Sequence, residues 1–370
     1  MDEDFLERKL QERKEGQSFR QLRLYQGGMD LCSNDYLGIV QNQWIKINTE
    51  GQEKLYGSAG SRLISGNYAL IEETEKDIAA FHNADAGLIF NSGYDANLGL
   101  LGSVPQRSDT IIYDQLSHAS IRDGIRLSLA RSFAFAHNDT VDLKNKLSVA
   151  EGRKFVVTES VFSMDGDMAP LEAITGLCMA HDALLIVDEA HATGVIGQKG
   201  EGLVQHLGLE QKCFARVHTF GKALGCHGAI VLGSGTLRDY LINFSRPFIY
   251  TTAVPAAAIM ATRAAYALFP GMKNERLQLH SLTAIFRDKA SAFRVCDSLT
   301  PIQGVLIPGN KQVRSVALAL QEKGFDVRPI LYPTVPKGLE RLRIILHAFN
   351  TGEEIGRLME GLRISISQKE

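Results

Sequence analysis

From about residue 70 onward, short apolar runs alternate with segments whose apolar residues are spaced for helices. Each run ends at polar or glycine residues, which is typical of strands buried on both faces of a parallel sheet. The alternation of strands and helices predicts an α/β fold with a doubly wound, mostly parallel central sheet. The predicted strands cover residues 87–90, 110–113, 155–157, 183–187, 216–217 and 229–232.

The two ends of the chain have patterns of their own. Residues 2–16 have the pattern of an amphipathic helix with Phe5, Leu6 and Leu10 on one face, and 29–33 of a short strand. We therefore expect an N-terminal helix with short strands over 1–45, a large α/β domain over 46–270 and a smaller C-terminal α/β domain over 271–370. The last region contains predicted helices at 276–293, 313–323 and 353–362 and predicted strands at 305–307, 327–331 and 342–346.

Composition excludes several classes of protein. The 370 residues are 45% hydrophobic and 22% charged, which is average for a globular protein and leaves enough apolar residues for a large core. A formal net charge of -2 does not indicate a nucleic-acid or membrane-surface partner. The apolar stretch 253–269 is interrupted by Pro255 and Arg263, so we expect no membrane span.

The cysteines indicate a reducing compartment. They stand at positions 32, 178, 213, 226 and 296, with no Cys-x-x-Cys pair and no cluster with zinc spacing. An odd, scattered set is typical of reduced thiols. Because the acidic N-terminus also lacks a signal-peptide pattern, we expect a cytoplasmic protein with no metal site.

Two charged residues follow strand candidates in the middle of the chain. Asp188 comes directly after the run 183–187, where open α/β sheets place ligands, and Lys222 follows the run 213–217 in a glycine-containing turn. Taken singly, Asp188 fits a helix cap and Lys222 a solvated loop residue. Together they suit pyridoxal 5′-phosphate (PLP), for which a lysine forms a Schiff base and a carboxylate keeps the pyridine nitrogen protonated.

Polar turns follow other predicted strands as well. Ser92 and Gly93 open a predicted helix, whose N-terminus can bind a phosphate, although an ordinary N-cap has the same pattern. His118 either stacks on a planar ring or packs as a core histidine. Ser163 either bonds a cofactor oxygen or shapes a turn.

Three other classes of site lack their motifs. Gly221 and Lys222 do not form a P-loop, because Arg216 stands where that motif needs its first glycine. No Gly-x-Gly-x-x-Gly follows the first strand, so a nicotinamide-binding fold has no support, and the Gly-x-Ser-x-Gly of α/β-hydrolases is absent.

Several segments, in order from about residue 5 to the C-terminus, resemble the α-oxoamine synthase family of fold-type I PLP enzymes. Two positions depart from the family pattern: Ile71 stands where relatives often have histidine, and residues 347–350 replace a Thr-Ala-x-His pattern with His-Ala-Phe-Asn. The resembling segments are Asp-Glu-Ala-His at 188–191, Thr-Phe-Gly-Lys-Ala at 219–223, Ser-His-Ala-Ser at 117–120, and the segments 33–38, 56–62, 246–252, 333–336 and 341–343.

The resemblance implies a role for each candidate residue. Lys222 forms the Schiff base with PLP and removes the α-proton of the substrate, Asp188 pairs with the pyridine nitrogen, and His118 stacks on the ring. Because sites of this family lie at a dimer interface, a homodimer with shared active sites is expected. The other implied contacts are His191 and Ser163 at the phenolic oxygen, Ser92, Gly93, Tyr94 and Thr219 at the phosphate, Thr251 and Thr252 at the phosphate in the neighbouring subunit, and Arg343, Asn34 and Thr334 at the substrate.

The implied reaction is a decarboxylating condensation of an amino acid with an acyl thioester. Within the family, the short N-terminal extension and the segment 246–252 favour L-alanine and a pimeloyl thioester of coenzyme A or an acyl carrier protein, as in biotin biosynthesis. Arg20 and Arg23 are candidates to bind the distal carboxylate, and surface arginines are the alternative for both. Other open alternatives are a glycine C-acetyltransferase or serine palmitoyltransferase activity, another PLP enzyme of this fold such as an aminotransferase, and a non-catalytic partner subunit, against which Lys222 argues.

Overall fold

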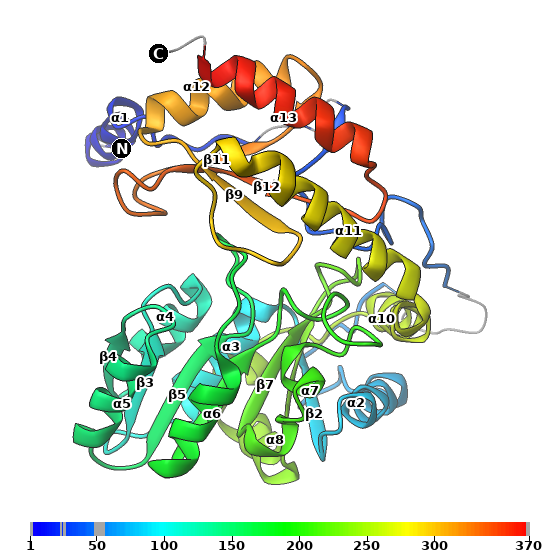
Figure 1. Cartoon of the computed structure of the whole chain (residues 1–370). Coiled ribbons are helices and arrows are strands. Elements are labelled where there is room, and N and C mark those ends of the chain that lie inside the picture. Colours follow the sequence, from blue (N-terminus) through cyan, green and yellow to red (C-terminus); the bar gives the residue numbers. More distant parts are fainter. Residues whose placement is uncertain (1–2, 23, 25–26, 48–55, 368–370) are drawn as a thin grey trace. The chain divides into compact units, whose positions relative to one another are not determined.

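The computed structural model describes residues 3–22, 24, 27–47 and 56–367 of the chain. It contains two compact units (Figure 1). Unit 1 comprises Met1–Tyr36, Ser163–Asp167 and Leu277–Glu370, and unit 2 comprises Leu37–Phe162 and Met168–Arg276. The segment Ser163–Asp167 is therefore part of unit 1, although the sequence on both sides of it belongs to unit 2.

Unit 2 is built on a seven-stranded sheet with the order β2-β8-β7-β6-β5-β3-β4. Strand β8 runs antiparallel to both of its neighbours, and the pairs from β7 across to β4 are parallel. The expected mostly parallel sheet is thus confirmed. The strands are β2 (Ala86–Phe90), β3 (Thr110–Asp114), β4 (Arg131–Phe135), β5 (Lys154–Glu159), β6 (Ala183–Asp188), β7 (Ala215–Thr219) and β8 (Ala229–Gly233).

Strand β4 is the one strand of this sheet that the apolar pattern does not predict. It lies at the sheet edge, where its first four residues are exposed, so it has no continuous apolar run. Helices flank the sheet (Figure 1). They are α2 (Ala69–Phe81), α3 (Gly93–Ser103), α4 (Ala119–Leu127), α5 (Thr140–Val149), α6 (Leu171–Ala180), α7 (Leu203–His206), α8 (Gly235–Phe244), α9 (Arg246–Ile249) and α10 (Ala256–Leu268).

The parallel strands of unit 2 place polar residues together at the carboxyl ends of the strands. Strands β5, β6 and β7 are neighbours and end at Glu159, Asp188 and Thr219. The apolar residues before these ends, such as Phe155, Ile186 and Val217, are buried in the core. Burial of the strand interiors therefore fixes where the carboxyl ends and their turns lie, and ligands of open α/β sheets bind at such ends.

Unit 1 contains a three-stranded antiparallel sheet, β11-β12-β9, and the short parallel pair β1 and β10. The strand expected at 327–331 is confirmed as Arg328–Ile330, which pairs with β12, whereas the two-residue strand Phe325–Asp326 before it, which pairs with β1, was not predicted. The elements are α1 (Asp4–Glu15), β1 (Met29–Asp30), α11 (Lys273–Lys289, whose first four residues belong to unit 2), β9 (Ile302–Leu306), α12 (Asn310–Gln321), β10 (Phe325–Asp326), β11 (Arg328–Ile330), β12 (Arg341–Ile345) and α13 (Gly352–Ser367).

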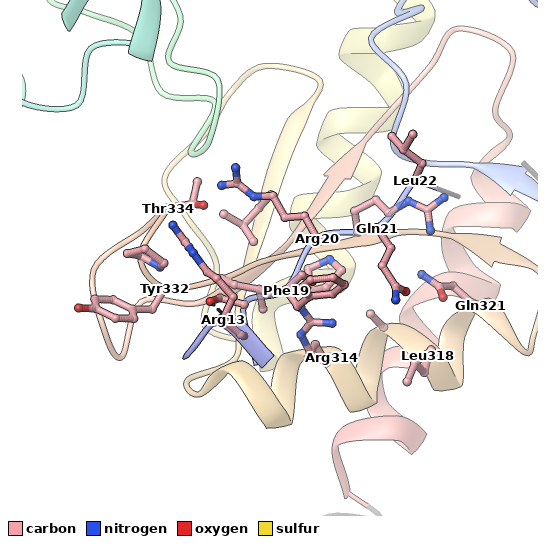
Figure 2. A pocket seen from close by; sticks show the side chains of 17 residues that line it. Arg13, Phe19, Arg20, Gln21, Leu22, Arg314, Leu318, Gln321, Tyr332 and Thr334 are labelled. Atoms are coloured by element: carbon pink, nitrogen blue, oxygen red, sulfur yellow. Dashed lines mark hydrogen bonds between the residues drawn. The ribbon is translucent and has the colours of Figure 1, made fainter. Parts of the chain in front are cut away.

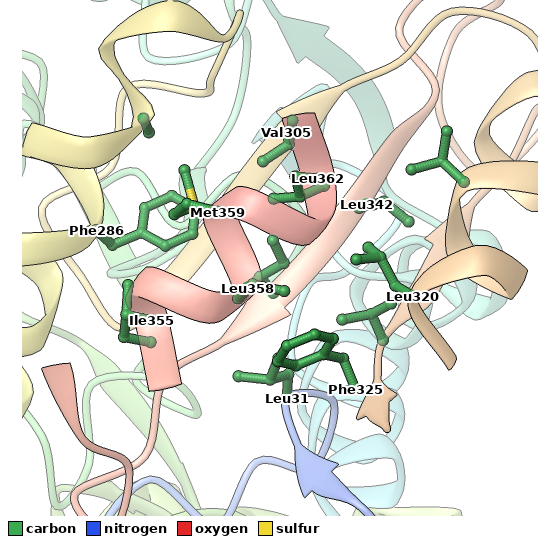
Figure 3. Packing of buried hydrophobic residues seen from close by; sticks show 14 of the residues in the cluster. Leu31, Phe286, Val305, Leu320, Phe325, Leu342, Ile355, Leu358, Met359 and Leu362 are labelled. Atoms are coloured by element: carbon green, nitrogen blue, oxygen red, sulfur yellow. The ribbon is translucent and has the colours of Figure 1, made fainter. Parts of the chain in front are cut away.

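The core of unit 1 lies between this sheet and its helices. Leu342 of β12 and Leu358 of α13 are fully buried, as are Phe286 and Leu320 on α11 and α12 (Figure 3). Helix α1 confirms the expected N-terminal helix, but none of its residues is buried, and its predicted apolar face is exposed. In the part of the chain that the structure describes, no helix has the length and apolar character that crossing a bilayer requires.

Candidate active site

Lys222 and His191 meet beyond the ends of two neighbouring strands. Lys222 lies in the turn after β7, and His191 in the turn after β6, which pairs with β7 in parallel. The two turns therefore leave the sheet at the same edge. The Nζ of Lys222 lies 2.8 Å from Nε2 of His191, which is a buried residue.

Asp188 is the last residue of β6, and its side chain is held by two donors. Its Oδ1 accepts a hydrogen bond from the backbone N–H of Ala190 (2.8 Å), and its Oδ2 accepts one from Nδ2 of Asn97 (2.7 Å). Only 6% of Asp188 is exposed. Because each oxygen accepts from a different donor, the orientation of the side chain is fixed.

His118 is the N-cap of α4, and its backbone N–H donates to Oε1 of Glu159 (2.6 Å). Although His118 is solvent-exposed as a residue, burial of part of its ring lowers its pKa, and the neighbouring Lys222 lowers it further. Glu159 ends β5 beside Asp188. Burial, together with the charge of Asp188, raises the pKa of Glu159 to about 8.

The N-terminus of α3 and the end of β7 together form an anion cradle. Ser92 caps α3, its Oγ accepting from the backbone N–H of Asp95 and donating to the carboxylate of that residue. The first-turn N–H groups of Gly93 and Tyr94 have no helical carbonyl to bond, as at every helix N-terminus. The Oγ1 of Thr219 is buried and, among the described residues, lacks a hydrogen-bond partner.

The close approach of α3 to Thr219 at the end of β7 explains the glycine at position 93. A Cβ there would lie 2.5 Å from Cγ2 of Thr219, so a larger residue would push α3 away from β7. The phenol of Tyr94 donates a hydrogen bond to Asp123 of α4, which ties α3 to the helix that His118 caps. The two helix N-termini are thus held together.

Thr251 and Thr252 follow α9 and are anchored by one side chain. The Nδ2 of Asn91 donates to Oγ1 of Thr251 (3.1 Å) and to the carbonyl of Thr252 (3.0 Å). Because Asn91 directly precedes Ser92, this contact fixes the threonines relative to the start of α3. Thr252 is exposed.

In unit 1, the structure brings Arg343, Asn34 and Ser163 together. The Nε of Arg343 donates to the carbonyl of Ser163 (2.6 Å), and its Nη2 donates to Oδ1 of Asn34 (3.1 Å). The phenol of Tyr36 donates to the same Oδ1 (3.3 Å), and burial raises the pKa of that phenol to about 12. These contacts hold the Arg343 guanidinium in place beside Ser163 and Asn34.

Unit 1 also contains a cavity of about 500 Å³ beside α12 and β11 (Figure 2). Arg20 and Thr334, both predicted to bind substrate, line it, whereas Arg23 lies outside the described residues. No carboxylate is among its described lining residues. Its charged and polar lining includes Arg13, Arg20, Gln21, Arg314, Gln321, Arg328 and Thr334, and its apolar lining includes Phe19, Leu22, Leu318, Leu331 and Tyr332.

The two departures from the family pattern have structural roles here. Ile71 is fully buried in α2. The Oδ1 of Asn350, also a buried residue, accepts from the backbone N–H of His347 (2.8 Å), while Nε2 of His347 lies 3.1 Å from Oγ of Ser33. Asn350 therefore shapes the turn that follows β12.

The sequence pattern did not point to Asn97, Ser120 or Glu159, yet all three are buried and contact the predicted residues. A signal for Glu159 was available, because it ends its strand as Asp188 ends the next one. A weaker signal for Asn97 was its place between apolar residues on α3. Ser120 had no signal beyond its place in the Ser-His-Ala-Ser segment.

The sequence matches the family described as aminotransferase class I and II over residues 26–362. The chain belongs to this family. It is 42% identical over 400 residues to the 8-amino-7-oxononanoate synthase of Emericella nidulans, an alignment that covers 99% of this chain and 96% of that protein. The resemblance to α-oxoamine synthases is thereby confirmed.

Solved structures agree with this placement. A serine palmitoyltransferase from S. paucimobilis with bound PLP and myriocin has a TM-score of 0.88 at 25% identity, covering 99% of this chain and 97% of that chain. The 8-amino-7-oxononanoate synthase of Francisella tularensis has a TM-score of 0.77 at 27% identity, covering 92% of this chain and 98% of that chain. The expected PLP-transferase fold is confirmed.

Proposed function

We propose that the chain is a PLP-dependent acyltransferase that condenses L-alanine with a pimeloyl thioester and releases carbon dioxide and the thiol. The product is 8-amino-7-oxononanoate, an intermediate of biotin biosynthesis. One observation carries the proposal: the Lys222 amine lies beside His191 at the sheet edge where Asp188 ends β6. The names of relatives that align over nearly the whole chain supply the substrates.

The residues of unit 2 fit PLP. The Oγ1 of Thr219, which has no hydrogen-bond partner among the described residues, and the first turn of α3 offer donors to a phosphate, and Gly93 leaves the space. The fixed carboxylate of Asp188 can accept a hydrogen bond from the N–H of a pyridinium ring, and the exposed His118 offers a ring face. When bound, PLP supplies an electron-poor ring that stabilises the carbanion left by α-proton removal.

Each catalytic residue then has a defined task. Lys222 would hold the cofactor through Nζ and, once substrate has displaced its amine, would take the α-proton from alanine and later return a proton to the product. His191 orients Nζ from 2.8 Å. Asp188 keeps the ring nitrogen protonated, because its negative charge favours the cationic form.

Arg343 binds the carboxylate of the amino acid. Its guanidinium is already oriented by the carbonyl oxygen of Ser163 and by Asn34, so little conformational freedom is lost on binding. A planar fork of donors suits a carboxylate better than a lysine would. Ser163 and His191 are each candidates for a contact to the phenolic oxygen.

The arginine-lined cavity of unit 1 binds the distal carboxylate of the pimeloyl group. Arg20 and Thr334 supply donors, and Phe19, Leu331 and Tyr332 supply apolar contacts for methylene groups. The described lining has no acidic residue that would repel a carboxylate. Without the donors of this lining, removing the carboxylate from water would be costly. A plain fatty-acyl chain has no charged end, so it would not need a lining of arginines.

The enzyme is a homodimer with shared sites, in which Thr251 and Thr252 reach the phosphate of the neighbouring subunit. The exposed Thr252 and the exposed apolar residues Ile64 and Tyr250 support an interface in this region of unit 2. A mass measurement on the cofactor-loaded enzyme tests this, and a fully active monomer would exclude it. All five cysteines are free thiols, which supports a reducing compartment such as the cytoplasm.

The deciding experiment is a matrix of amino acids against acyl thioesters, scored by release of free thiol. Alanine with a pimeloyl thioester should react fastest, offered both on coenzyme A and on an acyl carrier protein. Faster release with glycine and a short acyl group, or with serine and a long one, would assign the chain to a sister activity. No release with any pair would support a non-catalytic subunit.

A further inference from the structure

A buried asparagine connects two of the proposed cofactor contacts. Asn97 lies inside α3, is 2% exposed, and directs its side chain toward the sheet edge. Its Nδ2 donates to Oδ2 of Asp188 (2.7 Å) and to Oγ of Ser120 (3.0 Å). Because an amide nitrogen carries two hydrogens, both bonds can form at once.

The second bond determines the protonation of His118. Since Asn97 donates to Oγ of Ser120, the hydroxyl hydrogen of Ser120 is available to Nδ1 of His118, which lies 2.8 Å away. The backbone N–H of Ser120 also points at this Nδ1 (3.2 Å). A nitrogen that receives two donors is an acceptor, so the ring hydrogen of neutral His118 resides on Nε2.

The first bond holds Asp188. Its Oδ1 is held by the backbone N–H of Ala190, which would by itself allow the carboxylate to rotate about that contact. The Asn97 amide at Oδ2 removes this freedom. One side chain therefore sets the plane of the carboxylate on one side and the tautomer of the imidazole on the other.

We propose that Asn97 is a positioning residue of the reaction: through its two hydrogen bonds it orients Asp188 toward the cofactor's ring nitrogen and, by way of Ser120, fixes the Nε2–H tautomer of His118. This inference rests on the proposed binding of PLP, but on no particular amino acid or thioester. Burial lowers the pKa of His118, which favours the neutral form of the ring. Residues that only pack the core would affect neither group specifically.

The test compares three variants of the holoenzyme. Asn97→Leu removes both bonds at similar volume, Ser120→Ala breaks only the link to His118, and Thr74→Val is a control for losing a buried helical hydroxyl that bonds only within α2. Nitrogen-15 NMR of labelled histidine reports the tautomer of His118. The same method on PLP labelled at the ring nitrogen reports whether that nitrogen is protonated.

In the wild-type protein, Nδ1 of His118 should have the resonance of an unprotonated nitrogen. Ser120→Ala should change this signal and leave the PLP nitrogen unchanged, whereas Asn97→Leu should change both and lower kcat about 10- to 100-fold, as when hydrogen-bond partners of metal ligands are removed. Thr74→Val should change neither. A proton on Nδ1 in the wild type, or an Asn97→Leu enzyme with both signals unchanged, would overturn the proposal.

The wild-type spectrum needs no variant, so it decides the tautomer even if Asn97→Leu does not fold. The outcome is also separate from that of the proposed function. A chain that does not bind PLP contradicts the proposed function itself, because no PLP signal would then be seen. A chain that binds PLP with the predicted signals but prefers another thioester contradicts only the substrate assignment.

Discussion

Nζ of Lys222 and Nε2 of His191 lie 2.8 Å apart although 31 positions separate them in the sequence. The parallel pairing of β6 with β7 brings them together, since each residue lies in the turn that follows its strand. A lysine held by an imidazole at a strand end is positioned for chemistry rather than for solvation. The predictions that follow start from this pair.

Lys222→Ala should abolish activity and the covalent link to the cofactor, because no other amine is proposed to bond it. The purified wild-type protein should be yellow, and borohydride should fix the cofactor to the chain, as detected by the mass of the intact protein. The variant should show no such mass increase. A reducible adduct that persists in Lys222→Ala would remove the assignment of this lysine.

Asp188→Asn should still fold and bind PLP but lose about 10²-fold or more of its kcat, because a neutral amide cannot stabilise a cationic ring nitrogen. Steady-state kinetics and a cofactor titration measure the two effects separately. Wild-type turnover in this variant would mean that Asp188 does not face the ring. Loss of cofactor binding alone would indicate a purely structural role.

Arg20→Gln should raise KM for the pimeloyl thioester more than it lowers kcat, as expected when an interaction is equally strong in the ground state and the transition state. The matched control is the heptanoyl thioester, which has the same chain length without the distal carboxylate. With that substrate, Arg20→Gln and the wild type should behave alike. An equal effect on both thioesters would place the distal carboxylate elsewhere.

Glu159 should make the stability of the protein depend on pH. Its pKa rises from the ordinary 4.5 to about 8 in the folded chain, so the folded state holds an extra proton between these values. The stability that this proton contributes is fully present below pH 4.5 and is lost as the pH rises through about 8.

Glu159→Gln cannot ionise and keeps an oxygen that can accept from the backbone N–H of His118. Relative to the wild type, its melting temperature should therefore increase steadily across this pH window and level off above it. Glu172→Gln, at an exposed position of α6, is the control and should show no such trend. A difference independent of pH would mean that the carboxyl of Glu159 does not titrate in the window.

The sequence pattern predicted the sheet of unit 2 well because its strands are buried on both faces and therefore read as continuous apolar runs. It failed at β4, an exposed edge strand, and at β10, a two-residue strand that pairs with β1 just before the chain enters β11 of another sheet. Such pairing depends on partners distant in sequence. Local pattern carries no information about them.

For the candidate site, residues at strand ends and helix N-termini could be predicted, since Asp188 and Ser92 follow clear apolar runs. Asn97 and Ser120 could not, because their contacts to Asp188 and His118 exist only once α3 and α4 pack on the sheet. Arg343 and Asn34 were identified by resemblance alone. Their contact joins positions 309 residues apart in the chain.

Residues 163–167 belong to unit 1, although the sequence on both sides of them belongs to unit 2. No single division of the gene can therefore separate the two units. The carboxylate of Asp165 pairs with Arg341, and the hydroxyl groups of Ser298 and Thr300 donate to the carbonyl of Gly166. A fragment ending at residue 276 would keep this loop but lose those partners. Neither half of the gene therefore encodes a complete folding unit, and splitting the protein for complementation requires that both fragments be present while they fold.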